Sequence, residues 1–345
     1  MESEGKELKR ETWLSLSPIL GLLRGLMACL ALVWALEGGS HMRAHTTTPT
    51  DPALAGPCSV TSQDVQIAGT LDVTLYYPSG GCDAESAPPY PAVVFAHGFS
   101  MFGLSDGRRD NAGNGEHLAS WGYVTALPRL PDDFAARRKA LKDVVDYLIA
   151  QAGATSGHLA GIVDPQRIAL VGHSLGGASV LALAAQDARI VTVVALDPVY
   201  HGGMPGNMSE VWDPGPDAPH ITAPTGILGA PPSSCNAQAD YTRLYPLVGA
   251  RPKASFEIVG ASHCAFNNPG SSFCGLICSG STDAQHKALG KRYMTAWLNV
   301  YLAGLGAYDT YLYGAQADQD IRQGRIVRQV DQGAERKVYL PIVSR

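Results

Sequence analysis

Short apolar stretches alternate with amphipathic and small-residue stretches through most of this chain. The unbroken apolar run 91–96 is typical of a strand in a sheet covered on both faces, and 190–196 is a further expected strand. Residues 134–151 instead place their aliphatic side chains on one side of a helix. We expect further strands at 65–77, 124–127, 167–171, 225–228 and 256–259, and further helices at 178–185 and 283–302. This alternation predicts a single domain with a doubly wound, mainly parallel α/β sheet.

The two ends of the chain depart from this pattern. Basic residues precede a mostly apolar stretch at 13–36, so we interpret residues 1–38 as a signal peptide or signal anchor. Residues 39–57 are polar and rich in Thr and Pro, which indicates a linker. These boundaries leave 58–305 as the domain that carries the chemistry. Residues 306–345 form a C-terminal extension of unknown role, with short alternating stretches but no chemical motif.

Composition and charge narrow the classes of partner. The N-terminal segment predicts a secreted or periplasmic protein, which would contact a membrane only if that segment stays uncleaved. A net charge of −5 without a basic stripe offers no electrostatic support for a nucleic-acid partner. The 345 residues, 46% of them hydrophobic, can bury a large core. A small-molecule or polymeric substrate without charge fits this composition better.

Cysteine usage agrees with export. One of the seven cysteines, Cys29, lies in the N-terminal segment, and the other six are an even set that could form three disulfides. Cys58 and Cys82 flank the first expected strands, so we expect them to pair.

The later cysteines leave two interpretations open. As disulfides they allow three pairings, which spacing does not resolve, among Cys235, Cys264, Cys274 and Cys278. The alternative is a zinc site that combines His263 with the last three of these cysteines. Only Cys274 and Cys278 have the spacing usual for zinc thiolates, so we favour disulfides and expect no metal.

Residues 168–177, IALVGHSLGG, contain the strongest chemical signal. An apolar strand runs into Gly172-His173-Ser174-Leu175-Gly176, which fits the G-x-S-x-G pattern of a nucleophilic serine on a strained strand-to-helix turn. Glycine is needed there because larger side chains would collide with the adjoining helix and strand. The expected helix 178–185 follows, so strand, turn and helix occur in the required order. Ser174 is therefore predicted to be the nucleophile of a serine hydrolase.

A serine hydroxyl needs a histidine to take its proton and a carboxylate to orient that histidine. His263 follows the strand 256–259 and a short turn, late in the chain as this arrangement requires. Asp197 ends the strand 190–196 at the carboxyl edge of the sheet, beside the expected turn. Asp240 is the alternative acid, and its loop would have to fold back toward His263. The residues favour Asp197 and leave Asp240 open.

Two backbone amides are needed to bind the negatively charged oxygen of the tetrahedral intermediate. The amide of Leu175, directly after the nucleophile, is the first. The second is expected in the segment His97-Gly98-Phe99-Ser100 after the strand 91–96, with the amide of Phe99 as donor. Candidate substrate contacts are Ser100, Met101 and His173, and this chemistry requires no cofactor.

Together these motifs resemble the chlorophyllase-like branch of the α/β-hydrolase superfamily and, more loosely, the bacterial cutinase-like polyester hydrolases. The similarity covers about residues 65–302. The stretch 172–177 is similar to the G-H-S-x-G-G of chlorophyllases, and Asp197-Pro198-Val199 resembles the segment that carries their acid. The turn that ends at His263 resembles that of the polyester hydrolases. The resemblance implies an α/β-hydrolase fold with Asp197, rather than Asp240, as the acid.

The sequence therefore predicts a secreted serine carboxylic-ester hydrolase that acts on an apolar ester. Within this class, the alternatives are a chlorophyllase-type pigment ester hydrolase and a polyester hydrolase of the cutinase or PET-hydrolase type. A hydrolase-fold binding protein without turnover is the alternative from another class, and the complete set of serine, histidine and oxyanion motifs argues against it.

Overall fold

The computed structural model describes residues 49–333 except 84–85, 101–104, 202–210 and 271, so the signal segment lies outside the described residues. The strands are β1 (Ser59–Ile67), β2 (Leu71–Gly80), β3 (Tyr90–Ala96), β4 (Val124–Pro128), β5 (Val163–His173), β6 (Ile190–Leu196), β7 (Thr225–Gly229), β8 (Lys253–Ile258) and β9 (Ile326–Asp331). The α-helices are α2 (Gly107–Asp110), α3 (Ala112–Ser120), α4 (Phe134–Ala152), α5 (Leu175–Ala184), α6 (Pro214–Asp217), α7 (Asp240–Leu247), α8 (Ser272–Ile277), α9 (Ala284–Tyr301), α10 (Asp309–Leu312) and α11 (Ala315–Arg322). Short 3-10 helices lie at η2 (Ala218–His220), η3 (His263–Phe266) and η4 (Gly306–Tyr308).

The described strands form one sheet in the order β1-β2-β4-β3-β5-β6-β7-β8-β9. From β4 to β8 the neighbouring strands are parallel, whereas β1, β2 and β9 join antiparallel at the two sides. The predicted mainly parallel α/β sheet is therefore confirmed. Parallel strands end at the same edge, so segments that follow β3, β5, β6 and β8 meet there.

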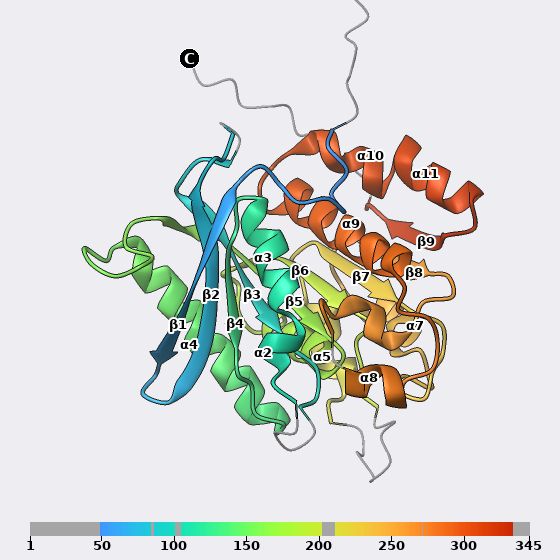
Figure 1. Ribbon diagram of the computed structural model, residues 1–345. Coiled ribbons are helices and arrows are strands. Elements are labelled where there is room, and N and C mark those ends of the chain that lie inside the picture. Colours follow the sequence, from blue (N-terminus) through green and yellow to red (C-terminus); the bar gives the residue numbers. More distant parts are fainter. Residues whose placement is uncertain (1–48, 84–85, 101–104, 202–210, 271, 334–345) are drawn as a thin grey trace, which may run out of the picture. The chain divides into compact units, whose positions relative to one another are not determined.

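Helices cover both faces of the sheet (Figure 1). Successive residues of a strand point to opposite faces, so Val94 packs with α4 and α5 whereas Phe95 packs with α3 and α9. Both side chains are fully buried. This two-sided packing explains the uninterrupted apolar runs in the sequence, and it gives the carboxyl edge of the sheet a rigid base.

The folded unit extends beyond both expected boundaries. At the N-terminal side it begins at Pro49, and Asp51 forms an ion pair with Arg292 of α9, with 2.9 Å between Nε and Oδ1. At the C-terminal side, β9 pairs with β8 from Lys253↔Asp331 to Ile258↔Ile326, beyond the expected end at residue 305. Neither segment is a separate linker or tail within the described residues.

A disulfide joins Cys58, just before β1, to Cys82, just after β2. This is the pairing expected from the sequence, and it ties the ends of the first hairpin together. Among the residues that the structure describes, no helix has the length and apolar character needed to cross a membrane.

Candidate active site

Ser174 lies at the turn between β5 and α5, where the backbone is strained. Its φ is +58°, in the left-handed region that residues with a side chain rarely adopt. A Cβ at Gly172 would lie 2.3 Å from the carbonyl oxygen of Gly176, and a Cβ at Gly176 would lie 2.1 Å from that of Ala96. Only glycine therefore fits on either side of Ser174. The turn leaves the serine itself partly exposed, as a nucleophile must be.

Asp197 and His263 form a buried pair at the same edge of the sheet. In the pairing of β5 with β6, His173 is opposite Leu196, so Ser174 and Asp197 are the next residues on neighbouring strands. His263 Nδ1 lies 2.6 Å from Asp197 Oδ2. Because a carboxylate only accepts, Nδ1 carries the proton, and Nε2 of the neutral ring is left with its lone pair. This arrangement prepares Nε2 to take a proton.

The other oxygen of Asp197 is held by neutral donors. Its Oδ1 accepts hydrogen bonds from the backbone amide of Ala230 at 3.2 Å and from Asn236 Nδ2 at 3.0 Å. Asp197 is completely buried, and its φ of +39° is one that aspartate tolerates better than most residues. With these donors and His263, both carboxylate oxygens are satisfied without contact with water.

Asp240, the alternative acid, is engaged elsewhere. Its Oδ2 accepts from the backbone amides of Tyr200 at 2.8 Å and His201 at 2.9 Å. Its Oδ1 lies 2.9 Å from His201 Nδ1. The structure thus contains two neighbouring Asp–His pairs, and the one that includes His263 uses Asp197.

His173, a candidate substrate contact, is only 3% exposed. Its Nε2 donates to the carbonyl oxygen of His263 at 2.9 Å, and the two rings lie 4.5 Å apart. Burial, with the nearby His263 ring as a smaller cause, holds the pKa of His173 well below its ordinary value. His173 therefore stays neutral and supports the position of His263 rather than lining the surface.

The segment 97–100 follows β3 and lies directly against the serine. A Cβ on Gly98 would be 3.0 Å from Ser174 Cβ. The backbone amide and Oγ of Ser100 each donate to Asp132 Oδ1 at 2.8 Å. Met101 lies outside the described residues. Leu175, whose amide is the other expected oxyanion donor, begins α5 and is buried.

Two side chains hold the Gly98 carbonyl oxygen. His97 Nδ1 lies 2.7 Å from it, and His97 Nε2 accepts from the amide of Leu130 at 2.9 Å, which fixes the tautomer. Arg137 of α4 donates to the same carbonyl oxygen at 3.1 Å and also to that of His97. Burial, with the Arg137 charge as a smaller cause, lowers the pKa of His97 to about 3, so His97 stays neutral.

This contact orients the next amide. The carbonyl and N–H of a planar trans peptide point in opposite directions, so holding the Gly98 oxygen also sets the direction of the Phe99 N–H. Arg137 is fully buried, and its NH1 group donates to the carbonyl oxygen of Pro131 at 2.8 Å. We call His97 and Arg137 the loop clamp.

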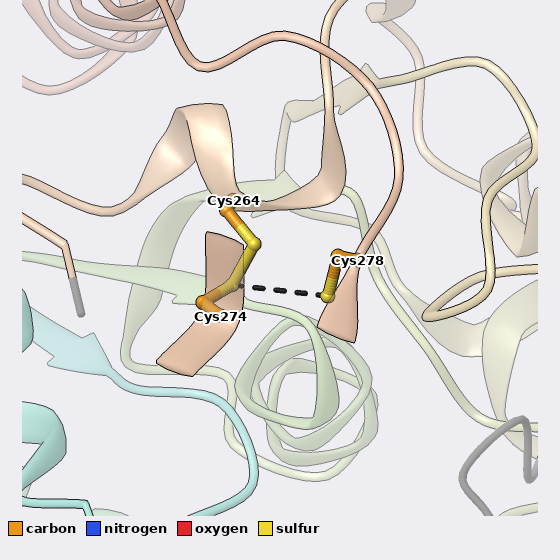
Figure 2. Close-up of side chains that lie close together, drawn as sticks. All are labelled: Cys264, Cys274 and Cys278. Carbon is orange, nitrogen blue, oxygen red and sulfur yellow. Dashed lines mark hydrogen bonds between the residues drawn. A yellow bond between two sulfur atoms is a disulfide. The ribbon is translucent and has the colours of Figure 1, made fainter. Parts of the chain in front are cut away.

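The four later cysteines are paired in two disulfides, Cys235–Cys278 and Cys264–Cys274. The sulfur atoms of Cys274 and Cys278 lie 3.9 Å apart, and Figure 2 shows the Cys264–Cys274 disulfide beside the sulfur atom of Cys278. Zinc binds free thiolates, whereas each of these cysteines is already bonded to its disulfide partner. The disulfide interpretation is therefore favoured over the zinc site at this cluster.

Sequence reasoning did not single out Arg137 or Asn236 as site residues. Arg137 stands among other charged residues in an amphipathic helix, where arginine is usually exposed. Asn236 follows Cys235 in an irregular loop, and its role depends on which strand end that loop approaches. The available signal was the resemblance of residues 229–241, which include Cys235-Asn236, to the chlorophyllase-like branch.

A family model described as PET hydrolase-like matches residues 43–329, which are most of this chain. Cutinase 1 of Thermobifida cellulosilytica is 28% identical over 282 residues, which cover 76% of this chain and 88% of that protein. A cutinase of Thermobifida fusca is also 28% identical over 282 residues, with 76% and 77% covered. The bis(hydroxyethyl) terephthalate hydrolase of Streptomyces coelicolor is 26% identical over 275 residues, with 75% and 72% covered. With this fold, strained serine turn and Asp–His pair, the chain belongs to the PET hydrolase-like family.

Proposed function

We propose that this protein is a secreted carboxylic-ester hydrolase that cleaves polyesters and small apolar esters with a serine nucleophile. The observation that carries the proposal is the 2.6 Å hydrogen bond between His263 and Asp197, next to the strained turn at Ser174. The names of the relatives, cutinases and a terephthalate ester hydrolase, support a polyester as the substrate class. These groups need no cofactor.

In the proposed reaction, Ser174 Oγ attacks the carbonyl carbon of the ester and its proton passes to His263 Nε2. Asp197 holds Nδ1 and stabilises the imidazolium that forms. His263 then gives the proton to the leaving alcohol as the C–O bond breaks, and the acyl group stays on Ser174. A water molecule that loses its proton to His263 attacks the acyl group and releases the acid.

The tetrahedral intermediates carry a negative charge on the former carbonyl oxygen. We assign its stabilisation to the amides of Phe99 and Leu175, one from the loop against Ser174 and one from the first residue of α5. The first amide depends on the loop clamp for its direction, because His97 and Arg137 fix the peptide that bears it. The second is fixed by the helix and gains from its dipole.

Replacing Arg137 by methionine is expected to lower kcat by about tenfold or more while KM changes little, because a misdirected donor weakens only transition-state binding. Both constants can be measured on p-nitrophenyl butyrate. The dissociation constant of an alkyl boronic acid should rise in parallel, because its tetrahedral adduct places an oxygen in the same position. Arg137→Lys, which keeps the charge and some donors, should lose less.

Arg138→Met is the matched control for the clamp. In the parent protein, the guanidinium carbon of Arg138 lies 5.6 Å from the centre of the Phe134 ring on the same helix. We expect kcat and boronate affinity near those of the parent protein. If a correctly folded Arg137→Met variant kept its boronate affinity, the loop clamp would have no role in orienting the oxyanion donor.

The proposed location is outside the cytoplasm. Three disulfides are present among the described residues, and such bonds persist in oxidising compartments. Residues 1–38 would direct export as a signal peptide, or tether the enzyme as an uncleaved anchor. N-terminal sequencing of the protein released by a secreting host distinguishes these two cases.

A substrate panel tests the proposed function. The mature protein is incubated with p-nitrophenyl butyrate, bis(hydroxyethyl) terephthalate, a solid polyester film, a chlorophyll, an amide and a thioester. We expect turnover of the soluble esters and release of acid from the film. A fluorophosphonate probe should label the protein and fail to label Ser174→Ala.

Other outcomes assign the protein differently. Preferential cleavage of the pigment would favour the chlorophyllase-type alternative, and faster cleavage of the amide or thioester would change the reaction class. A folded protein with neither labelling nor turnover would be a hydrolase-fold binding protein.

A further inference from the structure

Asn236 is buried between the two Asp–His pairs. It is 3% exposed, and its Nδ2 lies 3.0 Å from Asp197 Oδ1 and 3.3 Å from the carbonyl oxygen of Pro198. Its Oδ1 accepts from the backbone amide of Asp240 at 3.0 Å. The side-chain amide therefore uses both its donor and its acceptor, and its orientation follows from these partners.

The backbone around Asn236 is fixed as well. Its N–H and C=O both bond to Ser233, at 3.1 and 3.2 Å, which closes a tight turn after β7. The preceding residue, Cys235, is joined by a disulfide to Cys278. The amide is thus presented to Asp197 by a loop with little freedom to move.

An asparagine suits this place for a chemical reason. Asp197 has two oxygens, and the donors Asn236 and Ala230 occupy Oδ1, so Oδ2 is the one that faces His263. A neutral amide can occupy Oδ1 in this way without adding charge beside Asp197. A carboxylate at the same position would place a second negative charge against Asp197, which is unfavourable for the folded site.

Asp240 completes the arrangement from the other side. Its carboxylate accepts the amides of Tyr200 and His201, and its own amide binds Asn236. Asp240 thereby joins the segment after Asp197 to the loop after β7, and Asn236 of this loop binds the Asp197 carboxylate. This explains why Asp240 lies near the site although it does not contact His263.

We propose that Asn236 is a positioning residue of the Asp197–His263 pair, because it fixes which carboxylate oxygen faces the imidazole. The inference rests on the proposed function, since Asn236 acts through Asp197. It adds a side chain from the loop after β7 to the serine, acid and histidine that follow β5, β6 and β8. Asp240 serves as the anchor of that loop.

The pH dependence of catalysis separates positioning from a general effect on folding. Loss of a donor to Asp197 leaves its negative charge less dispersed, and this charge then stabilises the His263 imidazolium more strongly. The acid limb of the kcat/KM profile should therefore move to higher pH. Damage to folding alone would lower the rate without moving that limb.

The other titratable groups around the pair are His173, Tyr241 with Glu257, and Asp240 with His201. Burial lowers the pKa of His173, and burial with the Glu257 carboxylate raises the pKa of Tyr241, so both stay neutral near pH 7. His201 is the histidine of the neighbouring pair with Asp240. Its contribution is removed by measuring every profile again in a His201→Gln background.

The test uses Asn236→Leu, which removes the donor at similar volume, and Asn236→Asp, which adds a carboxylate. We expect Asn236→Leu to lower kcat by about tenfold, with KM within about threefold, and to move the acid limb up by about half a pH unit. Asn236→Asp should move the limb further, because a second negative charge is added. Both shifts should persist with His201→Gln.

Asn299→Leu is the matched control, since Asn299 is a buried asparagine that accepts from Tyr123 on the far side of the core. It should keep the parent profile. An unmoved acid limb in Asn236→Leu and Asn236→Asp, with the parent enzyme active, would overturn the positioning role. Loss of the proposed function itself would be recognised earlier, as absence of ester turnover in the parent protein.

Discussion

Ser174→Ala is expected to lower kcat on p-nitrophenyl butyrate by about 10⁵-fold, to the level that the oxyanion site and binding alone provide. KM and the thermal unfolding midpoint should change little. Serine and alanine both carry a Cβ, so the positive φ at this position costs the same in the two proteins. Only the reacting oxygen is lost.

Ser120→Ala is the corresponding control. Ser120 is a serine far from the site that is buried and hydrogen-bonded, accepting from the amide of Gly56 at 2.8 Å and donating to the carbonyl oxygen of His117 at 2.7 Å. Its loss should reduce stability by about 1 kcal/mol and leave kcat intact. Substantial turnover by Ser174→Ala, in the absence of contaminating esterase, would require another nucleophile.

The turn at Ser174 could be predicted from the sequence because its constraints are local. Gly172 and Gly176 are needed by close backbone contacts within the same strand-turn-helix unit, and one short motif encodes all of them. The helix α5 begins at Leu175 rather than at the expected residue 178, because the turn leads into the helix without a loop. The order of strand, turn and helix around Ser174 could be predicted from the same motif and its flanking residues.

The pairing of Asp197 with His263 depended on topology rather than on local sequence. The two residues are 66 positions apart, and the prediction used the rule that parallel strands end at one edge of the sheet. Asp240 also lies near that edge, so the rule favours Asp197 without excluding Asp240. The 2.6 Å hydrogen bond between Asp197 and His263, with Asp240 bound to His201 instead, distinguishes the two acids.

Arg137 and Asn236 show what the sequence could not provide. The pattern of α4 predicts a helix with a charged outer side, yet Arg137 is fully buried because the loop after β3 offers it two carbonyl oxygens. Such contacts depend on segments far apart in sequence. The pairing of the four later cysteines is unpredictable from spacing for the same reason.

The expected C-terminal end of the domain, residue 305, lies before β9 because the sequence pattern of this strand is weak. Residues 325–330 alternate in polarity, but the run is short and Val327 and Val330 remain exposed in β9. An edge strand buries one face incompletely, so its pattern is weak. Its identity as a strand depends on pairing with β8.

Asp197→Asn is expected to lower kcat at neutral pH by about 10⁴-fold, nearly as much as loss of the nucleophile. Asparagine tolerates the φ of +39° and has almost the same shape, so the fold should persist. The new amide group can donate to His263 Nδ1, which would place the ring proton on Nε2. In that tautomer, Nε2 cannot accept the proton of Ser174. The rate of fluorophosphonate labelling should fall in parallel with kcat, because both depend on the same base.

Asp240→Asn makes the same chemical change in the neighbouring pair and should have the opposite outcome. Its carboxylate accepts from Tyr200 and His201, so the substitution weakens the anchor of the segment after Asp197. We expect a lower unfolding temperature, with kcat within about tenfold of the parent protein, because no contact with His263 is lost. If Asp240→Asn instead lost the larger share of kcat, Asp240 would be the acid during turnover. That result would require the loop after β7 to move toward His263 when substrate binds.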